Sequence, residues 1–190
     1  MNHILRPIDP PYSDEITTLF KSYPQADDGY ILKLFRVFAN SLRFASNKGV
    51  ANLLDQDSPL SLREREIVIL RVTANTRCEY EWGVHVAVFA DAAAFTDEQI
   101  AATCSDSTEC WTERENALLG CVDQLCSSAR ISGEALTHFQ QFWTVEEQLE
   151  IMALCGHYHL VSYVANTTAL EREPVAARFP TRSCDLGDNT

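Results

Sequence analysis

The feature that most constrains the fold is a helix-start pattern that recurs along the chain. In this pattern, called a capping box, a Ser or Thr lies three residues before a Glu or Gln, and the two side chains satisfy backbone amides of the first helical turn. Each copy is followed by apolar residues at helical spacing, so each predicts a helix. The expected helices cover residues 61–76, 97–103, 112–128 and 145–170, and their capping boxes are Ser61–Glu64, Thr96–Gln99, Thr112–Glu115 and Thr144–Glu147.

Helical spacing of apolar residues also predicts helices between these segments. They are expected near residues 78–93 and 132–142, over residues 30–46, and in a short segment capped by Ser13 or Asp14. Only seven Gly and seven Pro occur among the 190 residues, and the loops between the predicted helices are short, which favours compact antiparallel packing. We therefore predict one all-α domain over residues 1–190.

Prolines mark both ends of this domain as extended. Pro7, Pro10 and Pro11 predict an arm over residues 1–12 that lies on the surface or on a neighbouring subunit. Residues 171–190 contain two further prolines and end in polar residues, so we expect a second arm there.

The charge of the chain excludes one large class of partners. The formal net charge is −12, and a surface this acidic repels phosphate backbones, so we expect no nucleic-acid partner. No apolar run reaches the roughly 18 residues of a membrane-spanning helix, and the N-terminal residues lack the apolar segment of a secretory signal. We therefore expect a cytoplasmic protein without a membrane partner. Its seven cysteines are expected to be reduced and mostly buried, Cys121 and Cys126 included.

A thiol, a carboxylate and an imidazole share one face of the helix predicted over residues 78–93. Cys78, Glu81 and His85 are three to four residues apart, which places them in line along that helix. Because Glu81 lies four residues before His85, its carboxylate can hydrogen-bond the imidazole, orient it and favour its protonated form. An imidazole held in this way transfers protons near neutral pH, so this face is a candidate reaction site.

The side chains around this face leave two questions open. Free amides at a helix start lower the pKa of a thiol such as Cys78, whereas the acidic side chains of Glu79 and Glu81 oppose its ionisation. Tyr80 and Trp82 either pack in the core or line a substrate pocket.

Two further histidines, His157 and His159, lie in the last predicted helix. They are two residues apart and therefore point to different sides of that helix, so they cannot both bind one metal ion. We expect no metal site.

Four of these residues together resemble a known signature. The spacing Glu66-x11-Cys78-x2-Glu81-x3-His85 looks like that of the alkylhydroperoxidase D/carboxymuconolactone decarboxylase superfamily. In the peroxidase branch a second redox cysteine stands where this chain has Glu81, so the resolving thiol is missing here. The Glu-x3-His portion instead resembles the decarboxylase branch. The segments LSLREREIVILR, CEYEWGVH, FTDEQIAA and GHYHLVSYVANT are also similar to members of this family.

The resemblance implies an all-α, alkylhydroperoxidase D-like bundle of about six to eight helices, in which a helical hairpin carries the site. It also implies a site without a cofactor and assembly as a homodimer, trimer or hexamer. Carried over by position, Glu81 and His85 transfer protons, and Glu66 and Cys78 lie beside them as further catalytic candidates. The candidate substrate-binding residues are Tyr80, Trp82 and His159.

This resemblance predicts a cofactor-independent lyase that transfers protons on a small lactone or a keto or enol acid, with decarboxylation or isomerisation as the outcome. One alternative is a thiol peroxidase that uses Cys78, which requires the fold to bring a resolving thiol such as Cys155 or Cys104 close. The other alternative is a non-catalytic oligomeric binding protein on the same scaffold.

Overall fold

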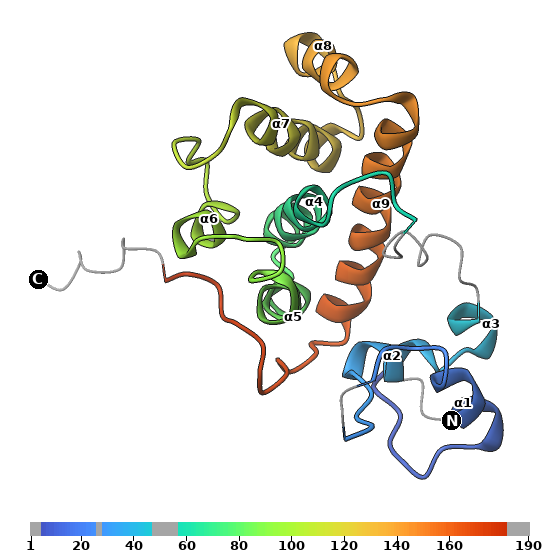
Figure 1. Cartoon of the computed structure of the whole chain (residues 1–190). Coiled ribbons are helices and arrows are strands. Elements are labelled where there is room, and N and C mark those ends of the chain that lie inside the picture. The colour runs from blue at the N-terminus through green and yellow to red at the C-terminus, as the bar shows by residue number, and fades with distance from the viewer. Residues whose placement is uncertain (1–4, 26–27, 47–56, 182–190) are drawn as a thin grey trace, which may run out of the picture.

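The computed structural model describes residues 5–25, 28–46 and 57–181. Within these ranges all the regular structure is helical, as predicted, and Figure 1 shows how the helices are arranged. The helices are α1 (Asp14–Phe20), α2 (Lys33–Phe38), α3 (Leu42–Ala45), α4 (Leu62–Asn75), α5 (Glu79–Phe89), α6 (Asp97–Ala102), α7 (Glu113–Ser128), α8 (Gly133–Phe142) and α9 (Val145–Thr167).

All four predicted capping boxes are present in the structure. In α4, for example, the Ser61 hydroxyl accepts from the Glu64 amide at 3.2 Å and the Glu64 carboxylate accepts from the Ser61 amide at 3.2 Å. The boxes of α4 and α7 are also linked to each other, because Arg114 donates to Glu64 at 2.7 Å and Arg63 donates to Glu115 at 2.5 Å. The same carboxylates thus cap two helices and join them. The other boxes start α6, α7 and α9 at Thr96, Thr112 and Thr144.

The single helix predicted over residues 30–46 is wrong, because the structure divides this segment into α2 and α3. The helix breaks after Phe38, where the Asn40 side-chain amide donates to the carbonyl of Val37 at 2.9 Å and to that of Arg6 in the N-terminal arm at 2.8 Å. An amide side chain that bonds nearby backbone competes with helix continuation. The arm contact therefore fixes a turn that the apolar spacing alone does not reveal.

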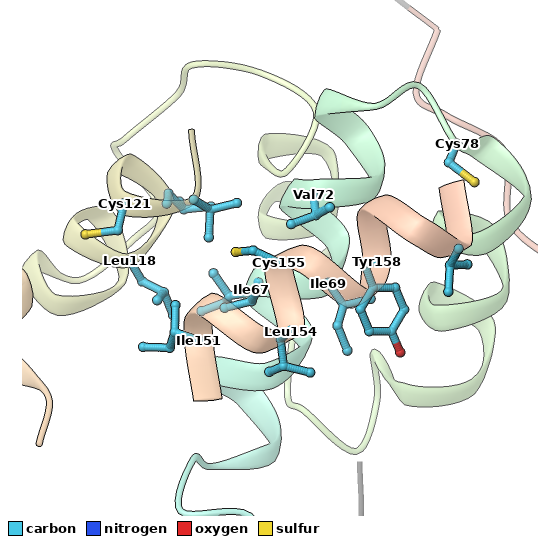
Figure 2. Close-up of a cluster of buried hydrophobic side chains, with 14 of the residues drawn as sticks. Ile67, Ile69, Val72, Cys78, Leu118, Cys121, Ile151, Leu154, Cys155 and Tyr158 are labelled. Atoms are coloured by element: carbon cyan, nitrogen blue, oxygen red, sulfur yellow. The ribbon is translucent and has the colours of Figure 1, made fainter. Parts of the chain in front are cut away.

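Helix α4 lies at the centre of the bundle and packs against α5, α7 and α9 (Figure 1). Its residues 66–73 are all buried, so every side of the helix faces another element. Ile67 and Ile69 meet Ile151 and Leu154 of α9 in the main core, which Figure 2 shows in close-up. A rigid, fully covered α4 provides a fixed base for any side chain that it presents to its neighbours.

Helix α9 is the longest element, with 23 residues, and it is buried on one side. Ile151, Leu154, Cys155 and Tyr158 face the core, whereas residues on the opposite side are exposed. Among the described residues, no helix is both long enough and apolar enough to cross a membrane.

The C-terminal arm connects α5 to the segment at the start of α2. Glu173 is 1% exposed, and its carboxylate accepts from the hydroxyls of Tyr30 (2.9 Å) and Tyr80 (2.6 Å) and from the Lys33 amide (3.0 Å). The last of these bonds satisfies an amide of the first turn of α2, so a residue 140 positions away helps to set where that helix begins.

Beyond Glu173 the arm runs alongside α5 (Figure 1). The Ala177 amide donates to the Gly83 carbonyl at 3.0 Å, and the Phe179 ring lies 5.1 Å from that of Trp82. A Cβ atom on Gly83 would lie 2.2 Å from the Ala177 carbonyl oxygen, so only glycine lets the arm approach this closely. The arm is therefore a strap that holds α5, and α5 carries most of the candidate site.

Candidate active site

A tight turn between α4 and α5 builds the hairpin that the sequence predicts. Arg77 has a left-handed backbone with φ 54°, the Cys78 amide donates to the Thr73 carbonyl at 2.8 Å, and the Arg77 amide donates to the Ala74 carbonyl at 3.0 Å. This pair of bonds is a Schellman motif, which closes α4. Cys78 therefore lies just after the end of α4 and immediately before the first residue of α5.

His85 lies at the centre of the candidate site, between side chains from three helices. Its Nδ1 atom is 2.8 Å from the Glu66 carboxylate of α4, and its Nε2 atom is 3.1 Å from the Tyr158 hydroxyl of α9 and 3.4 Å from the Glu81 carboxylate. The imidazole is 4% exposed, Glu66 2% and Glu81 7%. When both ring nitrogens are protonated, Nδ1–H donates to Glu66 and Nε2–H points toward Glu81 and Tyr158.

The charge of this cluster favours the imidazolium form of His85. Burial alone lowers the pKa of an imidazole, but the carboxylates of Glu66 and Glu81 outweigh burial and raise the pKa of His85 to about 10. The sequence predicts this effect for Glu81 alone. The structure shows that Glu66 makes the shorter contact, so both carboxylates act on the ring.

Cys78 lies at the start of the same helix but is not in an environment that ionises it. Its side chain is fully buried, and burial raises the pKa of the thiol; the Glu81 backbone amide opposes this shift, and the charge of the Glu81 carboxylate adds to it. Six cysteines lie in the described ranges, and all of them are free thiols. Burial also raises the pKa of the Cys155 thiol.

Tyr80 and Trp82 form hydrogen bonds with residues outside the cluster around His85. The Tyr80 hydroxyl donates to Glu173 of the strap, and the Trp82 indole N–H donates to the Thr103 hydroxyl at 3.0 Å. Both side chains are at most 5% exposed. The structure thus places these two predicted substrate-binding residues where they pack and anchor α5, on sides of the helix that face other elements.

The histidines of α9 also differ in their surroundings. The His157 ring is half-buried, and burial lowers its pKa; the nearby Glu81 opposes this shift and His85 adds to it. His159, a predicted substrate-binding residue, contacts the Cys155 carbonyl at 2.8 Å and the Tyr163 ring, and does not join the cluster around His85.

Tyr158, by contrast, is part of the cluster and was not predicted. It is 2% exposed, and its ring packs edge-on against the His85 ring at 5.2 Å. The signal available in the sequence was its place between two histidines in a helix that is apolar on nearly all sides.

Within the parts of the chain that the structure describes, no group of three or more His, Cys, Asp and Glu side chains is arranged to hold a metal ion. An open hollow of about 290 Å³ lies between the starts of α4 and α7. It is lined by capping-box residues and by Arg63 and Arg114, which pair with Glu115 and Glu64, respectively. None of the candidate site residues lines this hollow.

Comparisons with known proteins agree with this fold. A cysteine-to-alanine variant of the debrominase Bmp8, solved in complex with 2,3,4-tribromopyrrole, is 13% identical and superposes with a TM-score of 0.74 over 92% of this chain and 94% of that one. An uncharacterized peroxidase-related protein from Silicibacter sp. TM1040 is 18% identical, with a TM-score of 0.74 over 92% of this chain and 96% of that one. A search of curated proteins finds no significant match.

These likenesses confirm the predicted all-α, alkylhydroperoxidase D-like fold. Residues 44–124 match the sequence model of the carboxymuconolactone decarboxylase family, and this segment contains Glu66, Cys78, Glu81 and His85. Over residues 44–124 the chain is therefore similar to the carboxymuconolactone decarboxylase family, which agrees with the resemblance seen in the sequence motif.

Proposed function

We propose that this protein is a cofactor-independent lyase or isomerase that transfers a proton to carbon on a small lactone or a keto or enol acid. The observation that supports this proposal best is the imidazole of His85 held between the carboxylates of Glu66 and Glu81. A buried imidazolium fixed in this way is a general acid whose position is set before the substrate arrives.

The proposed reaction assigns one role to each side of the imidazole. Glu66 accepts from Nδ1–H and fixes the ring orientation, so the proton on Nε2 is the one that is transferred. In a decarboxylation, the carbon–carboxyl bond breaks, CO2 leaves, and the electron pair remains on an enolate or dienolate. Nε2–H then protonates a carbon of that intermediate, and the neutral imidazole recovers a proton from solvent. In an isomerisation Nε2–H first protonates one carbon of the enol acid or lactone, and the neutral nitrogen then removes a proton from another carbon, which restores the imidazolium.

Tyr158 and Glu81 hold the mobile proton in the resting state. The Tyr158 hydroxyl lies 3.1 Å from Nε2, close enough to orient this proton or to stabilise a developing enolate oxygen. Glu81 adds negative charge beside Nε2, which keeps the ring protonated until a substrate is bound.

The thiol peroxidase alternative is supported less well by the site. Peroxide reduction needs a thiolate at Cys78, whereas burial raises the pKa of that thiol, and the residue one turn later is Glu81 in place of a resolving cysteine. The debrominase and peroxidase-related neighbours share the fold at 13% and 18% identity, so they do not decide between the two reactions.

Absorbance assays with γ-carboxymuconolactone and related enol-lactone acids test the proposal. The wild-type protein should consume at least one of these compounds, and His85→Gln should lower kcat/KM by at least ~10²-fold. Cys78→Ser serves as the matched control, because it removes a thiol from the same helix; it should keep activity within a few-fold. Far-UV circular dichroism confirms that each variant is folded.

Two other outcomes would replace the proposal. If the protein reduces peroxide in the presence of a dithiol and Cys78→Ser abolishes this activity, the site is a thiol peroxidase. If neither reaction occurs in a folded protein that still binds such acids in calorimetry, the scaffold is a non-catalytic binding protein.

A further inference from the structure

The exposed side of α9 carries a straight line of apolar residues that nothing in the described parts of the chain covers. It consists of Val145, Leu149, Met152, Leu160 and Tyr163, which are 40–74% exposed, and of the exposed Gly156; we call this set the α9 stripe. At 3.6 residues per turn these positions lie within an arc of about 80°, on the side of the helix opposite Tyr158. The stripe is therefore separate from the candidate active site.

The composition of this side is unusual for the surface of so acidic a chain. The protein has a net charge of −12, yet every exposed residue of α9 between Leu149 and Thr167 is uncharged. Two copies of an acidic protein repel each other over most of their surfaces, and this repulsion is weakest where both present uncharged faces. A basic partner would instead be expected to bind where acidic side chains gather.

The stripe is also symmetric about its glycine. Met152 and Leu160 lie four residues on either side of Gly156, and Leu149 and Tyr163 lie seven residues on either side. When two such helices cross antiparallel at Gly156, Met152 of one copy faces Leu160 of the other, and Leu149 faces Tyr163. An isologous interface requires this self-complementarity, in which residue i meets j and j meets i.

Contacts within the described part of one chain do not explain why residue 156 is a glycine. A Cβ atom at this position would meet nothing within 4 Å, so the space does not require glycine, and glycine inside a helix costs about 1 kcal/mol relative to alanine. Close approach of a second helix at this point would explain the glycine, because the absence of a side chain lets the two backbones come together.

We propose that two copies of this chain pair through the α9 stripe, with the two α9 helices antiparallel and crossing at Gly156. At their exposed fractions, the five large side chains leave on the order of 500 Å² open per chain, so a pair buries about twice this area from them alone, near the lower limit for a specific interface. His159, which borders the stripe beside Tyr163, then lies at the edge of the interface.

Sedimentation velocity of the full chain over a range of concentrations tests this pairing. The wild type should sediment as a dimer or as a larger assembly with an even number of subunits. Met152→Glu and Leu160→Lys, made singly, each bury an unpaired charge against an apolar partner and should weaken the pairing by at least ~10²-fold. Val175→Glu is the control, because Val175 is 77% exposed in the strap and outside the stripe, and it should leave the assembly unchanged.

The double variant Met152→Glu/Leu160→Lys distinguishes the orientation of the helices. In the antiparallel pair each Glu faces a Lys of the other copy, so the double variant should recover the wild-type assembly. Within one chain the two positions are two turns apart and do not pair with each other. A monomeric or odd-numbered wild type, an assembly that the single variants leave intact, or a double variant that remains dissociated would each overturn the proposal.

Discussion

The strap can be tested at the single point where it touches the backbone of the site helix. Gly83→Ala adds one methyl group to α5, and the new Cβ atom would lie 2.2 Å from the Ala177 carbonyl oxygen. Because ordinary contacts of this kind are longer than 3.4 Å, the strap must move away by about 1 Å. We expect this movement to break the bond from the Ala177 amide to the Gly83 carbonyl and to disturb the packing of Phe179 on Trp82.

The size of the effect follows from the contacts that are lost. Each backbone hydrogen bond contributes about 1 kcal/mol net, and an aromatic pair contributes a further ~1 kcal/mol. Alanine regains up to about 1 kcal/mol through its better helix propensity. We therefore expect Gly83→Ala to lower the free energy of unfolding by ~1–3 kcal/mol, once the strain of the displaced strap is included.

Urea denaturation followed by circular dichroism measures this change, and Gly120→Ala provides the matched control. Gly120 lies inside α7, and a Cβ atom there would meet nothing within 4 Å, so the same substitution should stabilise the protein by up to ~1 kcal/mol. The two variants should thus shift stability in opposite directions. Equal stabilisation by both would refute the close approach of the strap to α5.

Three further predictions follow from the same contacts. Glu173→Ala leaves buried donors without an acceptor and should cost ~2–5 kcal/mol in urea denaturation, whereas Glu173→Gln, which keeps one acceptor oxygen, should cost less; equal losses would argue against the hydrogen bonds as the cause. Arg77→Gly relieves the left-handed backbone at an exposed position and should raise the free energy of unfolding by ~0.5–1 kcal/mol, an expectation that a destabilised variant would contradict. Since the pKa of His85 is raised from 6.5 to about 10, the stability that its charge contributes is complete below pH ~6.5 and is lost as the pH rises toward ~10; thermal melts should show this loss in the wild type and a flatter pH profile in His85→Gln.

Features that depend on local chemistry were predictable from the sequence. The capping boxes set the starts of α4, α6, α7 and α9 because both partners of each box lie within four residues. The division of residues 30–46 into α2 and α3 was not predictable. The break after Phe38 involves the contact of Asn40 with Arg6, and the start of α2 involves Glu173, which satisfies an amide of that helix from 140 residues away.

The candidate site shows the same distinction between local and distant contacts. The pairing of Glu81 with His85 follows from helical spacing, and the structure places the two side chains 3.4 Å apart. Spacing alone gives no sign that Glu66 makes the shorter contact; only the family motif suggested that residue. Tyr158 comes to His85 from a helix 73 residues away, and Tyr80 turns to the strap, so neither position could be assigned without the fold.

A ¹⁵N NMR titration of histidine-labelled protein tests most directly whether His85 is an imidazolium held by two carboxylates. Of the five histidines, the one whose signals disappear in His85→Gln should keep both ring nitrogens protonated at pH 8, and should lose the proton at lower pH in Glu66→Gln. A His85 ring that is already neutral at pH 7 in the folded wild type would contradict the charged cluster and, with it, the proposed general acid.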